Sequence, residues 1–431
     1  MIGTGHRRPT SPLWVVLSAL AILAAACGGG GSADTAQPGE TPGTSPVRTE
    51  DAAGEDEASA PSGDAWRLVM LTNQSGPFAP SGRDALAGAQ LRVDEINEEG
   101  GVLGRPIELD VQDTATDATR ATRLAESLQP SNDLMGVIGP EGAATSLAAK
   151  PVLAEKGILQ YANTGFWIPG QDGAPGDFDP LYFATHGPTL YGGATAPYRW
   201  MESEGYQTVG LLRSSDASGD LYSQLVQMGL EDHDVELVGE EVFDVEAVDV
   251  SAQMANLVDQ NPDVIYIGTT GPGLATALQA AQDLGVQQPI WAGWGSTTKP
   301  VAELVADRLP PAGLFSYGEA VHVYDELPDD WPQKPLLEEV APAFEEAGTE
   351  PTFDGAAAYD QVSILAMALE EVGEADHEAM AEWMETDMGE YVGIAYTYEF
   401  SEDDHRGIEG SGIIIRFGED ADFRLVTVLD E

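Results

Sequence analysis

The chain is poor in cysteine and in lysine, and both shortages exclude classes of structure. Its only cysteine is Cys27, so the 431 residues contain no internal disulfide. Lysine occurs four times, and 19 lysines and arginines stand against 73 acidic residues, which gives a formal net charge of −54. A surface of this charge repels nucleic acid and anionic lipid headgroups, so we expect neither as a partner of the folded part.

Catalytic and metal-binding motifs are also missing. The sequence has no G-x-S-x-G elbow, H-E-x-x-H motif or P-loop, and its six histidines are scattered without the spacing of metal ligands. Acidic pairs such as Asp113 with Asp117, or Asp403 with Asp404, arise by chance in so acidic a chain. We therefore expect no enzyme, no metal site and no cofactor, and a secreted hydrolase is the least favoured alternative.

There is one long apolar run, LWVVLSALAILAAA at residues 13–26. A basic segment precedes it and small residues end it, which is typical of an export signal and too short for a membrane span. LAAAC resembles the bacterial lipobox, although Ala24 stands where leucine is usual. We expect residues 1–26 to be a lipoprotein signal peptide and Cys27 to carry a lipid that anchors the protein to the outer face of the cell membrane. The alternative is an ordinary secretory signal that leaves Cys27 unmodified.

Residues 27–64 lack aromatic side chains and are rich in Gly, Ser, Thr, Pro and acidic residues. Such a segment cannot bury enough apolar surface to offset chain entropy, so we expect a flexible acidic tether. Acidic residues continue through the rest of the chain. This spread favours a solvated surface adapted to high salt, while attraction of a cationic ligand stays open as the alternative.

From about residue 66 the chain alternates short apolar runs with helical patterns. LMGVIG (134–139) is apolar throughout, as in a strand of a parallel sheet that helices cover on both faces. The alternation restarts after His186, and the last apolar segments look antiparallel. The predicted fold class is α/β, with two doubly wound parallel-sheet lobes. The expected strands are 67–72, 107–113, 134–139, 158–162, 208–213, 236–243, 263–268, 289–293, 313–318, 396–400, 412–417 and 424–428; the expected helices are one around Leu86–Ile96, then 117–128, 143–155 with a bend or break at Pro151, 189–204, 218–231, 249–260, 274–284, 335–348, 354–372 and 376–387.

Three segments carry a resemblance to a known family: LTNQSGPFAPSG (71–82), EINEEGGVLGRPIELDVQDTATD (95–117) and GVIGPEGAATSLAAKPVLAEKGI (136–158). Together they resemble the type I periplasmic solute-binding proteins, and among these the branched-chain amino-acid receptors of ABC importers, over about residues 66–428. The glycine turn in the second segment is a structural signature and not a site.

The resemblance implies a protein whose two lobes close on a small solute, and which passes that solute to ABC permease and ATPase subunits. It also implies a hinge in which the chain crosses three times between the lobes. We expect residues 66–187 plus 319–390 to form the N-terminal lobe and residues 188–318 plus 391–431 to form the C-terminal lobe. We expect the protein to be a monomer.

Ligands of open α/β sheets bind beyond the carboxyl ends of the strands, where loops meet helix N-termini. Each polar residue in such a loop has the alternative role of satisfying its own backbone. The candidate ligand-binding residues of the first lobe are Ser75, Phe78, Ser81, Glu141, Gly142, Ala143, Ala144, Asn163, Thr164, Gly165, Phe166 and Trp167, and those of the second lobe are Asp216, Ser218, Thr270 and Trp294.

Several of these positions differ from those of the amino-acid receptors that the family contains. Those receptors hold the ligand's carboxylate with a serine where Ala143 or Ala144 stands here. They hold its ammonium with a threonine and an acidic side chain where Phe166 and Gly295 stand, and a tyrosine that many of them use is replaced by Ser218. A desolvated α-amino acid needs both charged ends satisfied, so we do not expect a general leucine receptor.

The aromatic residues Phe166, Trp167 and Trp294 predict a clamp in which the solute stacks, with its polar ends held by backbone N–H groups near Gly142 and by Thr270. The expected solute is small and amino-acid-like, an amide, an aromatic acid or a polyol, and the acidic candidates leave room for a cation-bearing solute. A surface lipoprotein that reports a solute to a signalling system is the alternative function.

Overall fold

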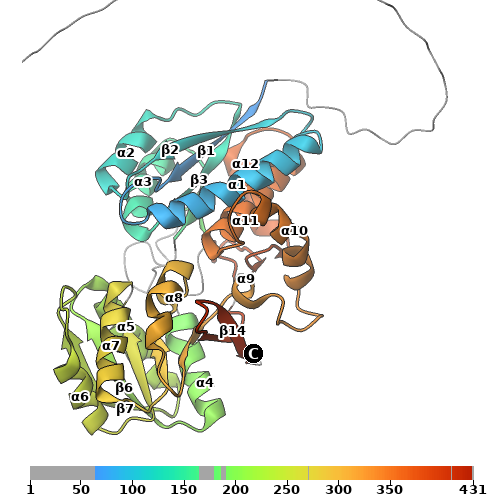
Figure 1. Ribbon diagram of the computed structural model, residues 1–431. Helices are drawn as coiled ribbons and strands as arrows, with labels where there is room; N and C mark the ends of the chain where they lie inside the picture. The colour runs from blue at the N-terminus through green and yellow to red at the C-terminus, as the bar shows by residue number, and fades with distance from the viewer. Residues whose placement is uncertain (1–63, 165–178, 186–190, 270, 409, 430–431) are drawn as a thin grey trace, which may run out of the picture. The chain divides into compact units, whose positions relative to one another are not determined.

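The computed structural model describes residues 64–164, 179–185, 191–269, 271–408 and 410–429 (Figure 1). All of them belong to one compact unit, Glu57–Glu431. The expected signal peptide, Cys27 and the tether up to Gly63 lie outside the described residues. No helix among the described residues is both long and apolar enough to cross a membrane.

The first sheet has five parallel strands in the order β2-β1-β3-β4-β5. Successive side chains of a strand point to opposite faces, and the two faces are covered differently. Leu68 and Met70 of β1 pack in one core with α1 and α11, whereas Val69 and Leu71 pack in another with α2 and α3. The elements are β1 (Trp66–Thr72), α1 (Ala79–Glu98), β2 (Ile107–Asp113), α2 (Ala118–Ser127), β3 (Leu134–Glu141), α3 (Ala143–Glu155), β4 (Gln160–Asn163), β5 (Tyr182–Ala184), α10 (Lys334–Glu346), α11 (Phe353–Val372) and α12 (His377–Thr386).

Helices α1 and α11 approach each other at two glycines. A Cβ atom added to Gly88 would lie 1.9 Å from the carbonyl oxygen of Gly355, and one added to Gly355 would lie 3.2 Å from that of Asp84. Only glycine allows backbones this close. The approach seats the first turn of α11, which follows its N-cap Thr352, against α1.

The second sheet has seven strands in the order β14-β13-β10-β9-β8-β6-β7, in which β13 pairs antiparallel with both of its neighbours, β10 and β14. Helices α6, α7 and α8 pack against the face that carries Leu212 and Ile265, and α4 and α5 against the face that carries Leu211 and Tyr266. The elements are a π-helical turn (Tyr191–Thr195), α4 (Ala196–Glu204), β6 (Thr208–Ser214), α5 (Ala217–Asp232), β7 (Glu236–Phe243), α6 (Ser251–Asp259), β8 (Val264–Gly268), α7 (Pro272–Leu284), β9 (Ile290–Ala292), 3-10 turns (Trp294–Ser296 and Ala306–Arg308), α8 (Lys299–Val305), β10 (Leu314–Tyr317), α9 (Ala320–Val323), β13 (Ile413–Phe417) and β14 (Phe423–Val428).

A small hairpin of β11 (Tyr391–Val392) and β12 (Thr397–Tyr398) packs on Asp360 of α11. The buried Asp360 carboxylate accepts hydrogen bonds from the backbone N–H groups of Ile394 and Ala395, both at 2.8 Å, and from the Tyr398 hydroxyl at 2.9 Å. Residues 394–400 share the core of the first sheet, whereas β13 pairs with β10 in the second. We therefore propose that the third crossing lies between residues 408 and 413, later than the boundary at residue 391.

The predicted fold class, two α/β lobes built on parallel sheets, is confirmed, and so are most of the predicted elements. Helix α3 runs through Pro151 as one helix, so the break that we considered there does not occur, and the bend stays a prediction. The expected strand 396–400 shortens to the two residues of β12, which pair with β11, and Tyr398 also forms an isolated bridge with Ile408. The short elements β5, α8 and α9 were not predicted, because three to seven residues are too few to show a period.

Candidate functional site

The carboxyl ends of β1, β2 and β3 are tied together by Asn73, which is fully buried. Its side-chain nitrogen donates to the backbone oxygen of Glu141 at 2.8 Å, and its Oδ1 accepts from the Thr114 hydroxyl and from the N–H of Thr116 at 3.1 Å. One side chain thus links three loops. This edge of the first sheet is fixed in advance of any ligand.

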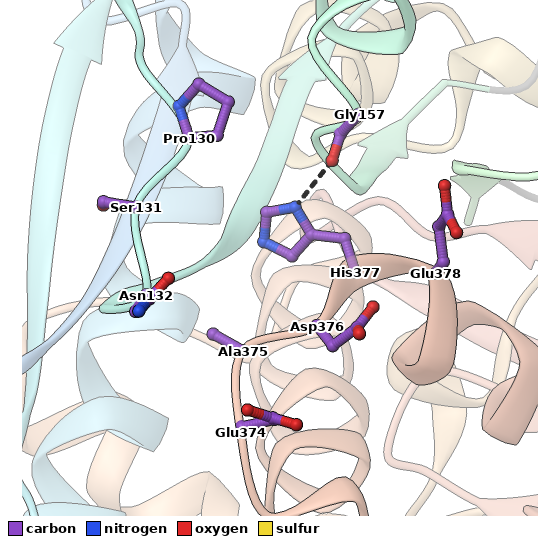
Figure 2. Close-up of a pocket in the computed structure, with 9 residues that line it drawn as sticks. All are labelled: Pro130, Ser131, Asn132, Gly157, Glu374, Ala375, Asp376, His377 and Glu378. Atoms are coloured by element: carbon purple, nitrogen blue, oxygen red, sulfur yellow. Dashed lines mark hydrogen bonds between the residues drawn. The ribbon is translucent and has the colours of Figure 1, made fainter.

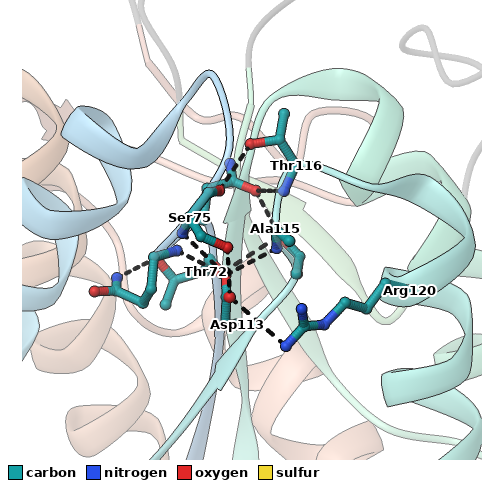
Figure 3. Close-up of polar contacts among 9 residues, drawn as sticks. Thr72, Ser75, Asp113, Ala115, Thr116 and Arg120 are labelled. Carbon is teal, nitrogen blue, oxygen red and sulfur yellow. Dashed lines mark hydrogen bonds and ion pairs between the residues drawn. The ribbon is translucent and has the colours of Figure 1, made fainter. Parts of the chain in front are cut away.

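Asp113, at the end of β2, organises the loop that contains Ser75 (Figure 3). Its carboxylate accepts from the Ser75 hydroxyl at 2.7 Å and from the N–H groups of Gln74 at 3.0 Å and Ala115 at 2.8 Å, and Arg120 lies 3.6 Å away. Burial alone would raise the pKa of Asp113, but the bonds from Ser75 and Ala115 and the charge of Arg120 outweigh it and lower the pKa. The candidate Ser75 is therefore engaged in shaping its own loop.

Glu141 is 4% exposed and is turned into the lobe. Its carboxylate accepts from the Thr72 hydroxyl at 3.0 Å and from the N–H of Asn73 at 2.9 Å. Burial raises the pKa of Glu141 more than these bonds lower it. Both of its oxygens already have partners, because the Thr72 hydroxyl also lies 3.2 Å from the second oxygen.

The candidates Phe78, Gly142, Ala143 and Ala144 lie where α1 and α3 begin. Phe78 is the N-cap residue of α1 and is 51% exposed. Its ring lies over Gly142, where an added Cβ atom would be 3.8 Å from it. Gly142 has a φ of 88° and caps α3 without a side chain, so the first-turn N–H groups of Ala143 and Ala144 have no partner within the helix.

Two further candidates, Ser81 and Asn163, meet on Asp354 in the first turn of α11. The Asn163 side-chain nitrogen donates to Asp354 Oδ1 at 3.0 Å, and Ser81 also hydrogen-bonds this carboxyl. Burial, together with the negative charges of Glu141 and Asp84, raises the pKa of Asp354 to about 8. Asn163 and its neighbour Thr164 are 1% and 2% exposed.

Sequence reasoning missed Asp354, because 191 residues separate it from Asn163 in the chain. Only the packing of α11 on α1 brings the two together. One signal was available: Asp354 and Asp360 are the only charged residues in the largely apolar stretch 353–369. Charged residues inside such a buried helix need partners, which makes each of them a candidate for a special role.

In the second sheet, the candidates Asp216 and Ser218 form a helix cap. Asp216 Oδ1 accepts from the hydroxyls of Ser214 at 2.6 Å and Ser218 at 2.9 Å and from the N–H of Gly219 at 3.1 Å. Burial opposes ionisation, but the bonds from Ser214, Gly219 and Ser218 prevail and lower the pKa of Asp216. Both side chains satisfy the start of α5.

The remaining candidates cannot be placed in the same detail. Gly165, Phe166, Trp167 and Thr270 lie outside the described residues. Trp294 opens the 3-10 turn that directly follows β9, at a strand end as expected. The aromatic clamp therefore stays a prediction.

A polar cavity of about 430 Å³ lies at the opposite ends of the strands of the first sheet (Figure 2). The ring of His377 borders it, with Nδ1 3.0 Å from the carbonyl oxygen of Gly157 and Nε2 2.8 Å from that of Leu134. Leu134 begins β3 and Gly157 precedes β4, so this cavity is at the amino ends of the strands. Ligands of such sheets bind at the carboxyl ends, and we do not place the solute here.

No group of three or more His, Cys, Asp or Glu residues that could hold a metal ion occurs in the described ranges. The candidate site thus consists of fixed loops at the carboxyl ends of the strands, the exposed ring of Phe78 and the buried carboxyl of Glu141.

The model of the family described as "Periplasmic binding protein" matches residues 65–415. The chain belongs to this family. Periplasmic binding proteins take up solutes outside the cytoplasm and serve transport, so this chain is a solute-binding protein and not an enzyme.

Related periplasmic binding proteins include a "Leucine-, isoleucine-, valine-, threonine-, and alanine-binding protein" of Pseudomonas aeruginosa, which is 22% identical over 74% of this chain and 82% of its own length. A "Leu/Ile/Val-binding protein homolog 1" of Brucella abortus is 23% identical over 75% of this chain and 83% of its own length. Among solved structures, an extracellular ligand-binding receptor from Rhodopseudomonas palustris has the same fold, with a TM-score of 0.70 at 20% identity over 84% of this chain and 99% of that one.

Proposed function

We propose that the protein is the substrate-binding lipoprotein of an ABC importer, tethered outside the cell membrane through Cys27, and that it captures a small organic solute at the carboxyl edges of its sheets. The observation that carries the proposal is the hydrogen-bonded arrangement of the loops at the carboxyl ends of the strands of the first sheet. There, Asn73 fixes three loops while Phe78 is left 51% exposed over Gly142. An exposed aromatic ring on a rigid loop is typical of a ligand-contact surface.

The arrangement favours a solute other than a plain α-amino acid. Alanines at positions 143 and 144 leave only backbone N–H groups at the start of α3 to hold an acceptor group of the ligand. The solute would present this acceptor to α3 and an apolar or aromatic face to Phe78. Amides, aromatic acids and amino-acid-like solutes with an altered polar end meet this description.

A thermal-shift screen of the full-length protein against a library of such solutes tests the binding function. A ligand present at one hundred times its dissociation constant should stabilise the protein by about 2.7 kcal/mol. If no solute of the library raises the melting temperature, the proposal of a small-solute receptor fails. Leucine or glutamate as the tightest ligand would refute the solute class and leave the receptor function standing.

Fractionation of cells that produce Cys27→Ser tests the anchor. The serine variant cannot accept the lipid, so it should appear in the soluble extracytoplasmic fraction, whereas the wild-type protein stays with the membrane. A Cys27→Ser protein that remains in the membrane fraction would refute the lipid anchor.

A further inference from the structure

Asp354 is a partly buried carboxyl group that has no cationic partner among the described residues. No ion pair among the described residues involves Asp354, Glu141 or Asp84, and the charges of the latter two act against its ionisation. Its position in the first turn of α11 helps only through the helix dipole. Burying an ionisable group in this way is costly unless another function retains it.

A second observation lies next to this carboxyl. Asn163 turns its nitrogen to Asp354, and its Oδ1 has no hydrogen-bond partner although the residue is only 1% exposed. The hydroxyl of Thr164, on a residue 2% exposed, is likewise without a partner. A buried polar atom that is left unpaired destabilises the protein, and the carboxyl and amide oxygens are both acceptors. The missing partner is therefore a hydrogen-bond donor.

Phe78 is close to this pair along α1. It precedes Ser81, which hydrogen-bonds Asp354, by one helical turn, and its exposed ring can contact a cation or the apolar part of a ligand. A metal ion would need more oxygen ligands than this, and no metal-binding group of acidic residues or histidines occurs in the part of the chain that the structure describes.

We propose that Asp354, together with Asn163, binds a cationic nitrogen group of the solute, an ammonium or an amidinium, beside the ring of Phe78. This inference rests on the proposed function and adds the charge of the ligand to it. The first lobe then holds a donor-bearing cation at α11, while the N–H groups of α3 face an acceptor. Asp354 is the residue that sets the specificity.

Three compounds of equal shape test the proposal: benzamidine, benzamide and benzoate. Isothermal titration calorimetry with the full-length protein should show benzamidine binding at least tenfold more tightly than benzamide and no binding of benzoate. Asp354→Asn should weaken benzamidine binding at least tenfold and change benzamide binding less than threefold. Asp376→Asn is the matched control, because Asp376 caps α12 of the same lobe through a bond to the N–H of Ala379 and should leave all three affinities unchanged.

The pH dependence separates binding by Asp354 from a merely structural role. Benzamidine stays protonated through this range, so its affinity for the wild-type protein should rise about tenfold per pH unit up to about pH 8 as the carboxyl ionises, and the rise should vanish in Asp354→Asn. Equal binding of benzoate and benzamidine, or a benzamidine affinity that Asp354→Asn leaves unchanged, would overturn the proposal. In that case another ligand from the solute library would show that the receptor function stands, and failure of the whole library would refute both.

Discussion

Asp354 of the first lobe and Asp216 of the second stand at equivalent places, each at the N-terminal end of a helix near the carboxyl edge of a sheet. Their environments differ in one respect. Asp216 receives three hydrogen bonds from Ser214, Ser218 and Gly219, and its pKa is lowered. Asp354 is partly buried beside two further carboxyls, and its pKa is raised to about 8.

The difference shows how an acidic residue at a strand edge can be assigned a role. A carboxylate whose acceptor capacity is filled by its own helix has no capacity left for a ligand, and its role is structural. A carboxyl that is desolvated and under-supplied with donors gains from a ligand that brings them. Asp360, on the same helix as Asp354, is a third case, because it is buried yet supplied with two N–H donors and a hydroxyl.

The largest loss of stability is expected for Asp360→Asn. The amide cannot accept both backbone bonds, so one N–H of the segment 394–395 loses its partner, which should cost about 3 kcal/mol. Urea unfolding at pH 8 measures the loss. Tyr398→Phe removes only the third bond and should cost less than half as much. Equal losses for the two variants would mean that the carboxylate does not hold this segment.

A change of opposite sign is expected for Asp354→Asn. The folded-state pKa of about 8 lies above the ordinary value of 3.8, so the folded protein binds more protons than the unfolded chain between about pH 4 and pH 8. Wild-type stability therefore falls as the pH rises through this window, and the uncharged variant avoids that fall. We expect a gain that is absent at pH 4, grows as the pH rises and is largest at about pH 8 and above, and urea unfolding at the two pH values measures it.

Asp360 also makes the wild-type protein less stable as the pH rises, because burial raises its pKa to about 7 despite the bonds from Ala395 and Ile394. The melting temperature of the wild-type protein should therefore be higher at pH 5 than at pH 8. Differential scanning calorimetry at the two pH values checks this, and a higher melting temperature at pH 8 would contradict the assignment of both groups.

The smallest change is expected for Asp216→Ala, which removes the cap of α5 and should cost about 1 kcal/mol. Because the pKa of Asp216 is lowered, its contribution is present at neutral pH and is lost as the pH falls below about 4. Solute binding should not change. A loss of affinity without loss of stability would make Asp216 a ligand residue after all and would break the comparison with Asp354.

Much of this could be predicted from the sequence, and the failures have physical causes. Apolar strands such as β3 are local features of the sequence, and they were found. Asp113 and Asp216 could be placed at strand ends, but the sequence alone could not say whether their donors come from neighbouring residues or from a ligand. Asp354 joins the site through its hydrogen bond with Asn163, which lies 191 residues earlier in the chain. A local sequence pattern cannot reveal such a contact.

The most direct test of the account is a count of the protons exchanged when benzamidine binds at pH 7. Titration calorimetry in two buffers of different ionisation enthalpy gives this number. Asp354 is protonated in the free protein at this pH and must ionise to pair with the amidinium, so the account predicts release of about one proton by the wild-type protein and none by Asp354→Asn. Binding to the wild-type protein without proton release, or with release that persists in Asp354→Asn, would contradict it.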